Sequence, residues 1–155
     1  PTEDCSWRER RCMGEVHDEK AACLGGLAGH AGLFGNANDL AGLGQIYLNE
    51  GGSGDVHILS ADTVRAATSC QIKLCGTRRG LGWLLPDECG ASPVGSAVHE
   101  TSYGHTGFTG TSLWVDPKRE LVIALLTNRV YYGRDAEKIK AFRVRLHNAI
   151  MSSSL

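Results

Sequence analysis

The hydrophobic pattern between residues 103 and 129 predicts three consecutive strands. Residues 121–126 form an unbroken apolar run with β-branched members and no glycine or proline, which is typical of a strand buried on both faces. The residues before Glu120, Asp-Pro-Lys-Arg, favour a turn because aspartate can hydrogen-bond the backbone ahead of it and proline fixes φ. The strands on either side of this turn are therefore expected to form a hairpin.

Two clusters of glycine change this picture locally. Gly104, Gly107 and Gly110 recur at every third position, a spacing that is poor inside a packed strand but useful where another backbone or a ligand must approach closely. A second cluster, at positions 25, 26, 29, 32 and 35, predicts that residues 21–34 form an irregular loop. Loops of this kind often carry function on a rigid scaffold.

Two helices are predicted between residues 36 and 69. Asn36 is a favourable N-cap, and apolar residues follow it at helical spacing as far as Tyr47. Ser60 is expected to cap a second, shorter helix.

A third helix is predicted at the C-terminal end, with Asp135 as its cap. One side of this helix is apolar, and we expect it to face the core. The other side is cationic, and we expect it to be solvated because the chain as a whole is close to neutral. The apolar side consists of Ile139, Phe142, Leu146 and Ile150. The cationic side consists of Lys138, Lys140, Arg143 and Arg145.

Together these elements predict an α+β fold in which helices flank an antiparallel sheet. Residues 1–11 are charged and aperiodic and are expected to form a loop or a frayed start, and residues 87–102 are expected to cross the surface. The predicted organisation is a loop-rich entry (1–35), two helices (36–69), the sheet strands (80–130) and a C-terminal helix (135–152).

Composition argues against some classes of function. The chain has 155 residues, enough for one domain or part of one. Its 16 basic and 17 acidic residues give a net charge of −1, which argues against nucleic acid as a partner. The six cysteines contain no Cys-x-x-Cys pair, so neither a metal site nor any other cofactor is predicted. Free thiols are the favoured state, and local bridges between Cys5 and Cys12 or between Cys70 and Cys75 are the alternative.

A family resemblance follows from the motifs. His105-Thr106-Gly107, followed by a hairpin and an amphipathic helix, resembles the third active-site motif of the serine β-lactamases and penicillin-binding proteins. The segment from Gly14 to Phe34, with its Gly-His-Ala-Gly-Leu-Phe ending, is similar to the class C β-lactamase branch, which also holds D-alanyl-D-alanine peptidases and esterases. The resemblance covers the chain from about Gly14 to the C-terminal helix.

The resemblance implies a serine acyl hydrolase that acts through an acyl-enzyme, but two of its motifs are missing. No serine is followed three residues later by lysine. Cys70-Gln71-Ile72-Lys73 has that spacing with a thiol in place of the hydroxyl, and we interpret the match as coincidence. Tyr47-Leu48-Asn49 matches the family's Tyr-x-Asn motif, but it comes at the wrong place in the order of the motifs along the chain. We therefore interpret Tyr47 as a core tyrosine. We therefore interpret residues 1–155 as the C-terminal part of a single β-lactamase-like domain, inactive alone.

The resemblance also implies a binding site for a small-molecule or peptide substrate. The Thr106 hydroxyl would donate to the substrate, Gly107 would leave room for it, and the Phe108 N–H would form half of an oxyanion hole. His105, where the family more often has lysine, would hold a carboxylate weakly and in a pH-dependent way, and Asn128 would lie near that carboxylate.

Several alternatives remain open on the sequence. His17, Asp18 and His30 lie in the glycine-rich segment, where hydrogen bonding to the loop backbone is favoured over catalysis. The chain can also be a non-catalytic penicillin-binding-like module for a peptide or a protein partner. Self-association, or pairing with an N-terminal segment, is expected if strand edges are exposed. By resemblance alone the location is the periplasm or cell envelope, and the chain carries no signal for it.

Overall fold

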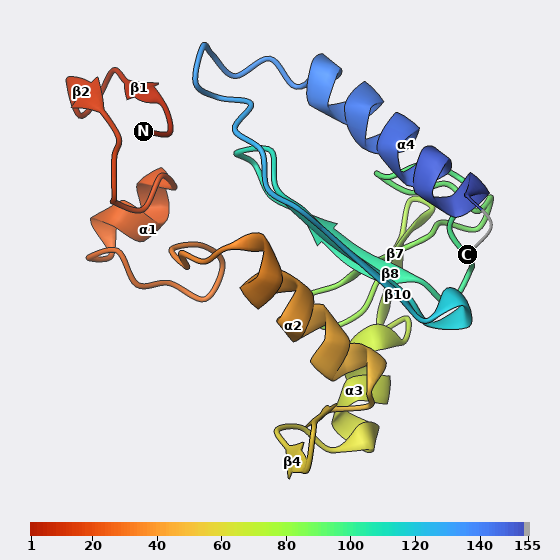
Figure 1. Cartoon of the computed structure of the whole chain (residues 1–155). Coiled ribbons are helices and arrows are strands. Elements are labelled where there is room, and N and C mark those ends of the chain that lie inside the picture. The colour runs from red at the N-terminus through yellow and green to blue at the C-terminus, as the bar shows by residue number, and fades with distance from the viewer. Residues whose placement is uncertain (154–155) are drawn as a thin grey trace.

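The computed structural model describes residues 1–153. Its central element is a six-stranded antiparallel sheet (Figure 1). The strand order is β10-β9-β8-β7-β6-β5, so every pair of neighbours is also consecutive in sequence. This confirms the prediction of an antiparallel sheet with flanking helices, although two of the strands, β5 and β6, precede the range 80–130 in which the sheet was expected. The strands are β5 (Ile72–Leu74), β6 (Thr77–Arg79), β7 (Leu84–Leu85), β8 (Tyr103–Thr106), β9 (Ser112–Asp116) and β10 (Leu121–Leu125).

The three strands predicted after residue 103 are confirmed as β8, β9 and β10, but the expected burial of residues 121–126 on both faces is wrong: β10 is an edge strand in which only Ile123 is buried, whereas β9 is buried throughout. Asp116 pairs with Leu121 across the last hairpin. Its carboxylate accepts hydrogen bonds from the amides of Lys118 (3.1 Å) and Arg119 (3.3 Å), so it caps the 3-10 turn η1 (Pro117–Arg119). The aspartate and the proline therefore do what turn chemistry predicts for them.

Helices cover both faces of the sheet (Figure 1). The predicted helices α2 (Ala37–Leu48) and α3 (Ala61–Thr68) are confirmed, with Asn36 in a capping box and Ser60 accepting from the amide of Thr63. Helix α2 lies against β9 and β10 so closely that a Cβ added at Gly44 would be 2.5 Å from Val122 Cγ1. Tyr47 packs on the ring of Trp83, at 4.9 Å between centroids, which confirms it as a core tyrosine.

Helix α4 (Glu137–Ser152) lies on the other face of the sheet, and its predicted orientation is wrong only at Phe142 and Arg143, since Ile139 is buried and Leu146 and Ile150 are half-buried. Ile139, Arg143 and His147 are its buried residues, whereas Phe142 is 39% exposed. Arg143 faces inward because its guanidinium donates to the backbone carbonyls of Gly107 and Thr111 in the turn between β8 and β9. The cap is also displaced: Asp135 accepts from the amide of Glu137, but the capping residue is Ala136.

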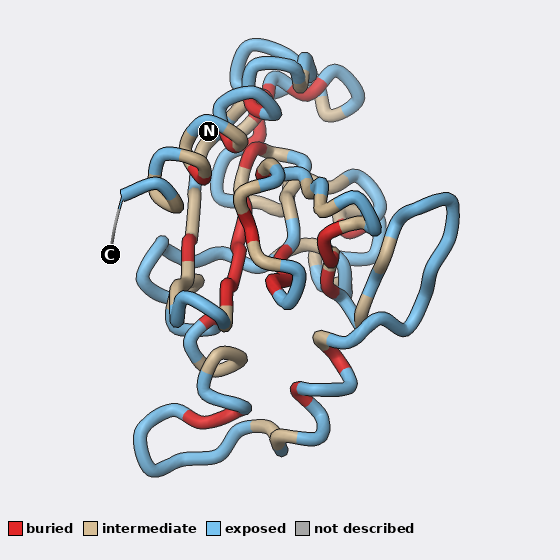
Figure 2. The backbone as a smooth tube through the Cα atoms, turned by 90° about the vertical axis from the view of Figure 1, so that its right-hand side faces the viewer, coloured by how far each residue is buried: buried red, intermediate tan, exposed pale blue. Residues whose placement is uncertain are grey.

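Residues 87–102 are not a purely surface segment. Val94 and Val98 are buried against Trp114 of β9 and form a second core cluster, separate from the one beneath α2. Trp114 also explains Gly104, because a Cβ added there would lie 2.1 Å from the indole ring. Figure 2 shows that the sheet strands carry buried positions in the middle of the molecule, with shorter buried stretches in peripheral segments whose loops are otherwise exposed.

The N-terminal segment is more ordered than predicted. Its hairpin of β1 (Asp4–Cys5) and β2 (Arg10–Arg11) buries Glu3, where a loop or frayed start was expected. Helix α1 (Glu19–Cys23) overlaps the start of the predicted loop 21–34, because Asp18 accepts from the amide of Ala21 and caps it. A second small hairpin, β3 (Gly52–Ser53) and β4 (Val56–His57), separates α2 from α3.

The six cysteines are all free thiols, so neither local bridge forms. Within residues 1–153, no helix combines the length and the apolar character that crossing a membrane requires.

Candidate functional site

A groove of about 920 Å³ lies where the end of β8 meets the glycine-rich segment. His105, Thr106, Gly107 and Phe108 line one side of it. Residues 28–34 line another side, so the two segments that carry the family resemblance face the same space although about 70 residues separate them in sequence. Four of the five predicted substrate-side residues, which are consecutive in sequence, thus line the groove.

Asn128, the fifth, does not line this groove. Its amide nitrogen donates to the carbonyls of Pro1 (3.1 Å) and Thr2 (2.9 Å), and its oxygen accepts from the amide of Val130 (3.0 Å). These contacts tie the N-terminal segment to the end of the sheet. Asn128 therefore acts as a capping amide and is not carried into the proposed site.

A tight turn follows β8 and carries the predicted oxyanion donor. The amide of Gly107 donates to Thr111 O (2.7 Å) and the amide of Gly110 donates to Gly107 O (3.1 Å), which places Phe108 and Thr109 at the tip. A Cβ added at Gly107 would lie 2.1 Å from Thr111 Oγ1. The side chain of Thr111 in the same turn therefore requires glycine at position 107, independently of any ligand.

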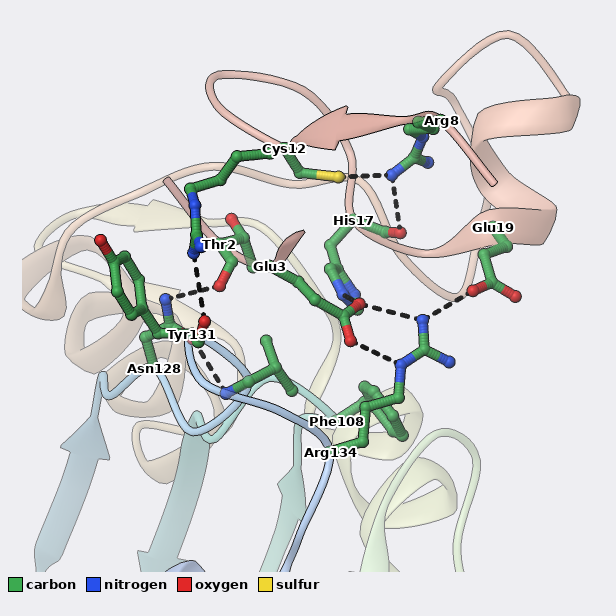
Figure 3. Close-up of polar contacts among 12 residues, drawn as sticks. Thr2, Glu3, Arg8, Cys12, His17, Glu19, Phe108, Asn128, Tyr131 and Arg134 are labelled. Carbon is green, nitrogen blue, oxygen red and sulfur yellow. Dashed lines mark hydrogen bonds and ion pairs between the residues drawn. The ribbon is translucent and has the colours of Figure 1, made fainter. Parts of the chain in front are cut away.

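The side chain of Phe108 is held against the protein beside the groove (Figure 3). Its ring stacks on His17 with 5.8 Å between centroids, and the guanidinium carbons of Arg129 and Arg134 lie 4.4 Å and 5.6 Å from the ring centroid. Both guanidinium groups are close enough to the ring for cation–π attraction.

An ion-pair network connects this wall of the groove to the N-terminus (Figure 3). Arg134 makes a two-pronged contact with Glu3, at 2.6 and 2.9 Å, and a further contact with Glu19 at 2.7 Å. His17 Nε2 lies 2.6 Å from Glu3 Oε2. The hydrogen bonds from Arg134 are the main reason that the pKa of Glu3 falls to about 2. Nothing in the sequence pattern indicates this network, since Glu3 and Arg134 are 131 residues apart.

The histidines of the glycine-rich segment pair with carboxylates, which corrects the expected bonds to loop backbone. His17 pairs with Glu3, and His30 Nε2 lies 3.0 Å from Asp18 Oδ1. The pKa of Asp18 is lowered, first by the amide of Ala21 and then by His30. Both pairs therefore fix the shape of the loop wall.

The remaining predicted residues lie as follows. His105 is exposed, and its Nδ1 lies 3.0 Å from Thr106 O, while Thr106 is half-buried. Cys70 does not line the groove, in keeping with its interpretation as a chance match. Within the described part of the chain, no three His, Cys, Asp or Glu side chains are grouped as metal ligands would be.

An antiparallel sheet with helices on both faces and a groove at the end of β8 defines a protein of the β-lactamase and penicillin-binding-protein fold. A family model described as Beta-lactamase matches residues 3–147. The chain therefore belongs to the beta-lactamase family, which confirms the resemblance that the motifs indicated.

Two kinds of relatives support this membership. A protein of Escherichia coli strain K12 named "Putative D-alanyl-D-alanine carboxypeptidase" is 42% identical over 124 residues, which is 79% of this chain and 28% of that protein. A counterpart of the same name from Escherichia coli O157:H7 is 43% identical over 118 residues, 75% of this chain and 27% of that protein. The chain thus spans little more than a quarter of the length of these relatives.

Solved structures agree on the fold. A beta-lactamase from Mycobacterium bovis superposes with a TM-score of 0.58 at 23% identity, over 79% of this chain and 46% of that one. A penicillin-binding protein homolog from Caulobacter crescentus superposes with a TM-score of 0.54 at 17% identity, over 71% of this chain and 30% of that one.

Proposed function

We propose that this chain supplies the substrate-binding strand of a serine acyl hydrolase whose substrate is a D-alanyl-D-alanine peptide or a related ester. In this proposal His105 and Thr106 contact the substrate carboxylate or carbonyl, and the Phe108 amide donates to the oxyanion that forms when serine attacks. The nucleophile comes from a segment outside residues 1–155, and the chain alone is inactive.

The observation that carries the proposal is the shared groove. His105, Thr106 and Phe108 line a cavity of about 920 Å³, which is large enough for a dipeptide. The names of the Escherichia coli relatives favour the D-alanyl-D-alanine class over other acyl substrates. Imidazole in place of the commoner lysine favours a peptidase or esterase over an enzyme that depends on tight carboxylate anchoring.

The direct test is covalent labelling. We expect residues 1–155 alone to form no adduct with a penicillin-type acylating probe, and the full-length parent protein to form one on a serine outside this chain. Intact-mass spectrometry followed by peptide mapping gives both answers. A stoichiometric adduct on a serine or cysteine of this chain, or no adduct on the parent with any penicillin or ester probe, would contradict the proposal.

The role of His105 has its own test in the parent protein. Protonated imidazole attracts a carboxylate and neutral imidazole does not, so kcat/KM for an anionic substrate should fall as pH rises. A neutral ester should show little of this trend. His105→Lys should flatten the profile because a lysine ammonium keeps its charge well above neutral pH.

The matched control is His57→Lys, which adds the same charge at an exposed site in the β3–β4 hairpin. Its profile should follow that of the wild type. Superimposable anionic-substrate profiles for the wild type and His105→Lys would mean that His105 is only a structural residue of β8.

A further inference from the structure

Arg143 of α4 extends to the turn at residues 107–111 from the face of the sheet that α4 covers. It is only 6% exposed, and its Nη2 donates to Gly107 O (3.1 Å) and Thr111 O (2.8 Å). Among residues 1–153 no carboxylate pairs with it, and its Nε has no partner. Burial, and then the nearby charge of Arg129, lower the pKa of this guanidinium. An unpaired buried cation is unfavourable, so the two turn carbonyls are the contacts that stabilise it.

The segment after β10 holds the same turn from another side. The backbone amide of Arg129 donates to Thr109 O (2.8 Å), and its Nε donates to Phe108 O (2.5 Å). The Thr127 hydroxyl donates to Gly110 O (2.6 Å). With the two bonds from Arg143, every carbonyl from residue 107 to residue 111 accepts a hydrogen bond from outside the turn.

The amides at the tip of the turn are left without such partners. Within residues 1–153 the N–H groups of Phe108 and Thr109 have no protein acceptor, and both residues line the groove. A carbonyl shares its planar peptide unit with the N–H of the following residue. The Phe108 N–H therefore belongs to the unit whose oxygen, on Gly107, is bound by Arg143. The Thr109 N–H belongs to the unit whose oxygen, on Phe108, is bound by Arg129.

This pairing has an electrostatic consequence. A hydrogen bond from a cation to the oxygen of a peptide unit draws electron density toward that oxygen and makes the N–H of the same unit a stronger donor. A donor that is fixed in advance stabilises a developing oxyanion without reorganising during the reaction. The two arginines thus both fix and polarise the free amides.

We propose that Arg143 and Arg129 are positioning residues, each of which holds and polarises one of the two turn amides that bind an oxyanion or carboxylate in the groove. The use of these amides in catalysis rests on the proposed function, whereas the coupling of each arginine to one amide does not. Arg143 acts on the Phe108 amide and Arg129 acts on the Thr109 amide.

The test is amide spectroscopy on the ¹⁵N-labelled 155-residue chain. In Arg143→Gln, the Phe108 amide proton should shift upfield, because a neutral side-chain amide polarises the peptide unit less than the guanidinium does. In Arg129→Gln, the larger shift should fall on the Thr109 amide. Arg143→Lys keeps a cation near the carbonyls and should restore part of the Phe108 shift. Arg145→Gln, on the exposed side of α4, is the matched control and should leave both amides unchanged.

Ligand binding adds a second readout. N-acetyl-D-alanyl-D-alanine should shift both amides in the wild-type chain, and its Kd should rise about tenfold in Arg143→Gln, by the loss of one charge-assisted contact to the donor unit. If this dipeptide does not shift the amides of the wild-type chain, the proposed function is contradicted. The amide shifts in the glutamine variants still decide whether each arginine is coupled to one amide.

Residue-specific outcomes separate positioning from general destabilisation. Equal shifts at Phe108 and Thr109 in both glutamine variants, or an unchanged Phe108 amide in a folded Arg143→Gln chain, would overturn the proposal. If Arg143→Gln does not fold, Arg129→Gln alone decides it: a shift that favours Thr109 supports the coupling, and its absence overturns it.

Discussion

His147 of α4 is fully buried, with 0% of its surface exposed, and within residues 1–153 neither of its ring nitrogens has a hydrogen-bond partner. Burial, followed by the nearby charge of Arg143, lowers the pKa of His147 from 6.5 to about 4. The imidazole is therefore neutral in the folded protein at physiological pH. Its neutrality keeps a second positive charge away from the guanidinium that holds the groove turn.

Protonation of His147 should destabilise the fold. Its folded pKa lies below its unfolded value, so the unfolded state binds the proton first as pH falls below 6.5. The free energy of unfolding should decrease by on the order of 3 kcal/mol between pH 6.5 and about 4, for a pKa shift of this size. Below about pH 4 this contribution should level off. Urea midpoints of the wild type and His147→Gln at intervals from pH 7 to 4 measure this, and the variant should lose less over that range.

His57→Gln, at an exposed histidine, should keep the wild-type dependence. Parallel curves for the wild type and His147→Gln would show that His147 does not control acid sensitivity.

Helix α2 shows how an element is fixed by its contact with the sheet. Its two interior glycines differ only in the direction they face. A Cβ at Gly42 would meet nothing within 4 Å, whereas a Cβ at Gly44 would lie 2.5 Å from Val122 and 3.1 Å from Leu113. Gly44 therefore sets how closely α2 approaches β9 and β10, and Gly42 only weakens the helix.

Alanine at these two positions should have opposite effects. Gly42→Ala should stabilise the chain by about 0.5 to 1 kcal/mol through helix propensity. Gly44→Ala gains the same propensity but must push α2 away from the sheet, so it should destabilise by roughly 1 to 3 kcal/mol overall. Thermal or urea unfolding of both variants gives the comparison. Equal and stabilising effects would mean that the helix and the sheet are less tightly packed than the structure has them.

The whole molecule leaves two features uncovered. β10 is one of the two edge strands of the sheet, the other being β5, and within residues 1–153 no strand pairs with its free edge. Large apolar side chains also lie open at the groove mouth, where Leu33 is 100% exposed and Phe34 is 70% exposed. Open strand edges and apolar patches promote association between chains.

We therefore expect the isolated chain to self-associate as its concentration rises. Sedimentation velocity over a hundredfold range of concentration measures this. Leu126→Lys places a charge beside the end of the β10 edge, and Leu33→Ser removes one apolar side chain from the groove mouth, so the variant that weakens association more identifies the responsible surface. A monomer at all concentrations would contradict the expectation.

The sequence by itself determined the features that depend on neighbouring residues. The unbroken apolar run of β10, the Asp-Pro turn and the caps at Asn36 and Ser60 are local, because periodicity, turn chemistry and capping act within a few positions. The His105-Thr106-Gly107 motif could be recognised for the same reason, because a short run of consecutive residues is characteristic of its family. Fold class and candidate strand could both be predicted in this way.

Only the tertiary structure decided which surfaces meet. The periodic pattern of α4 placed Phe142 inside and Arg143 outside, and the structure reverses both, because the binding of Arg143 to the carbonyls of Gly107 and Thr111 depends on residues at least 32 positions away. The pairing of Glu3 with Arg134 has the same origin. Contacts across such separations are selected by the packing of the whole chain, and neither a periodic pattern nor a local propensity carries them.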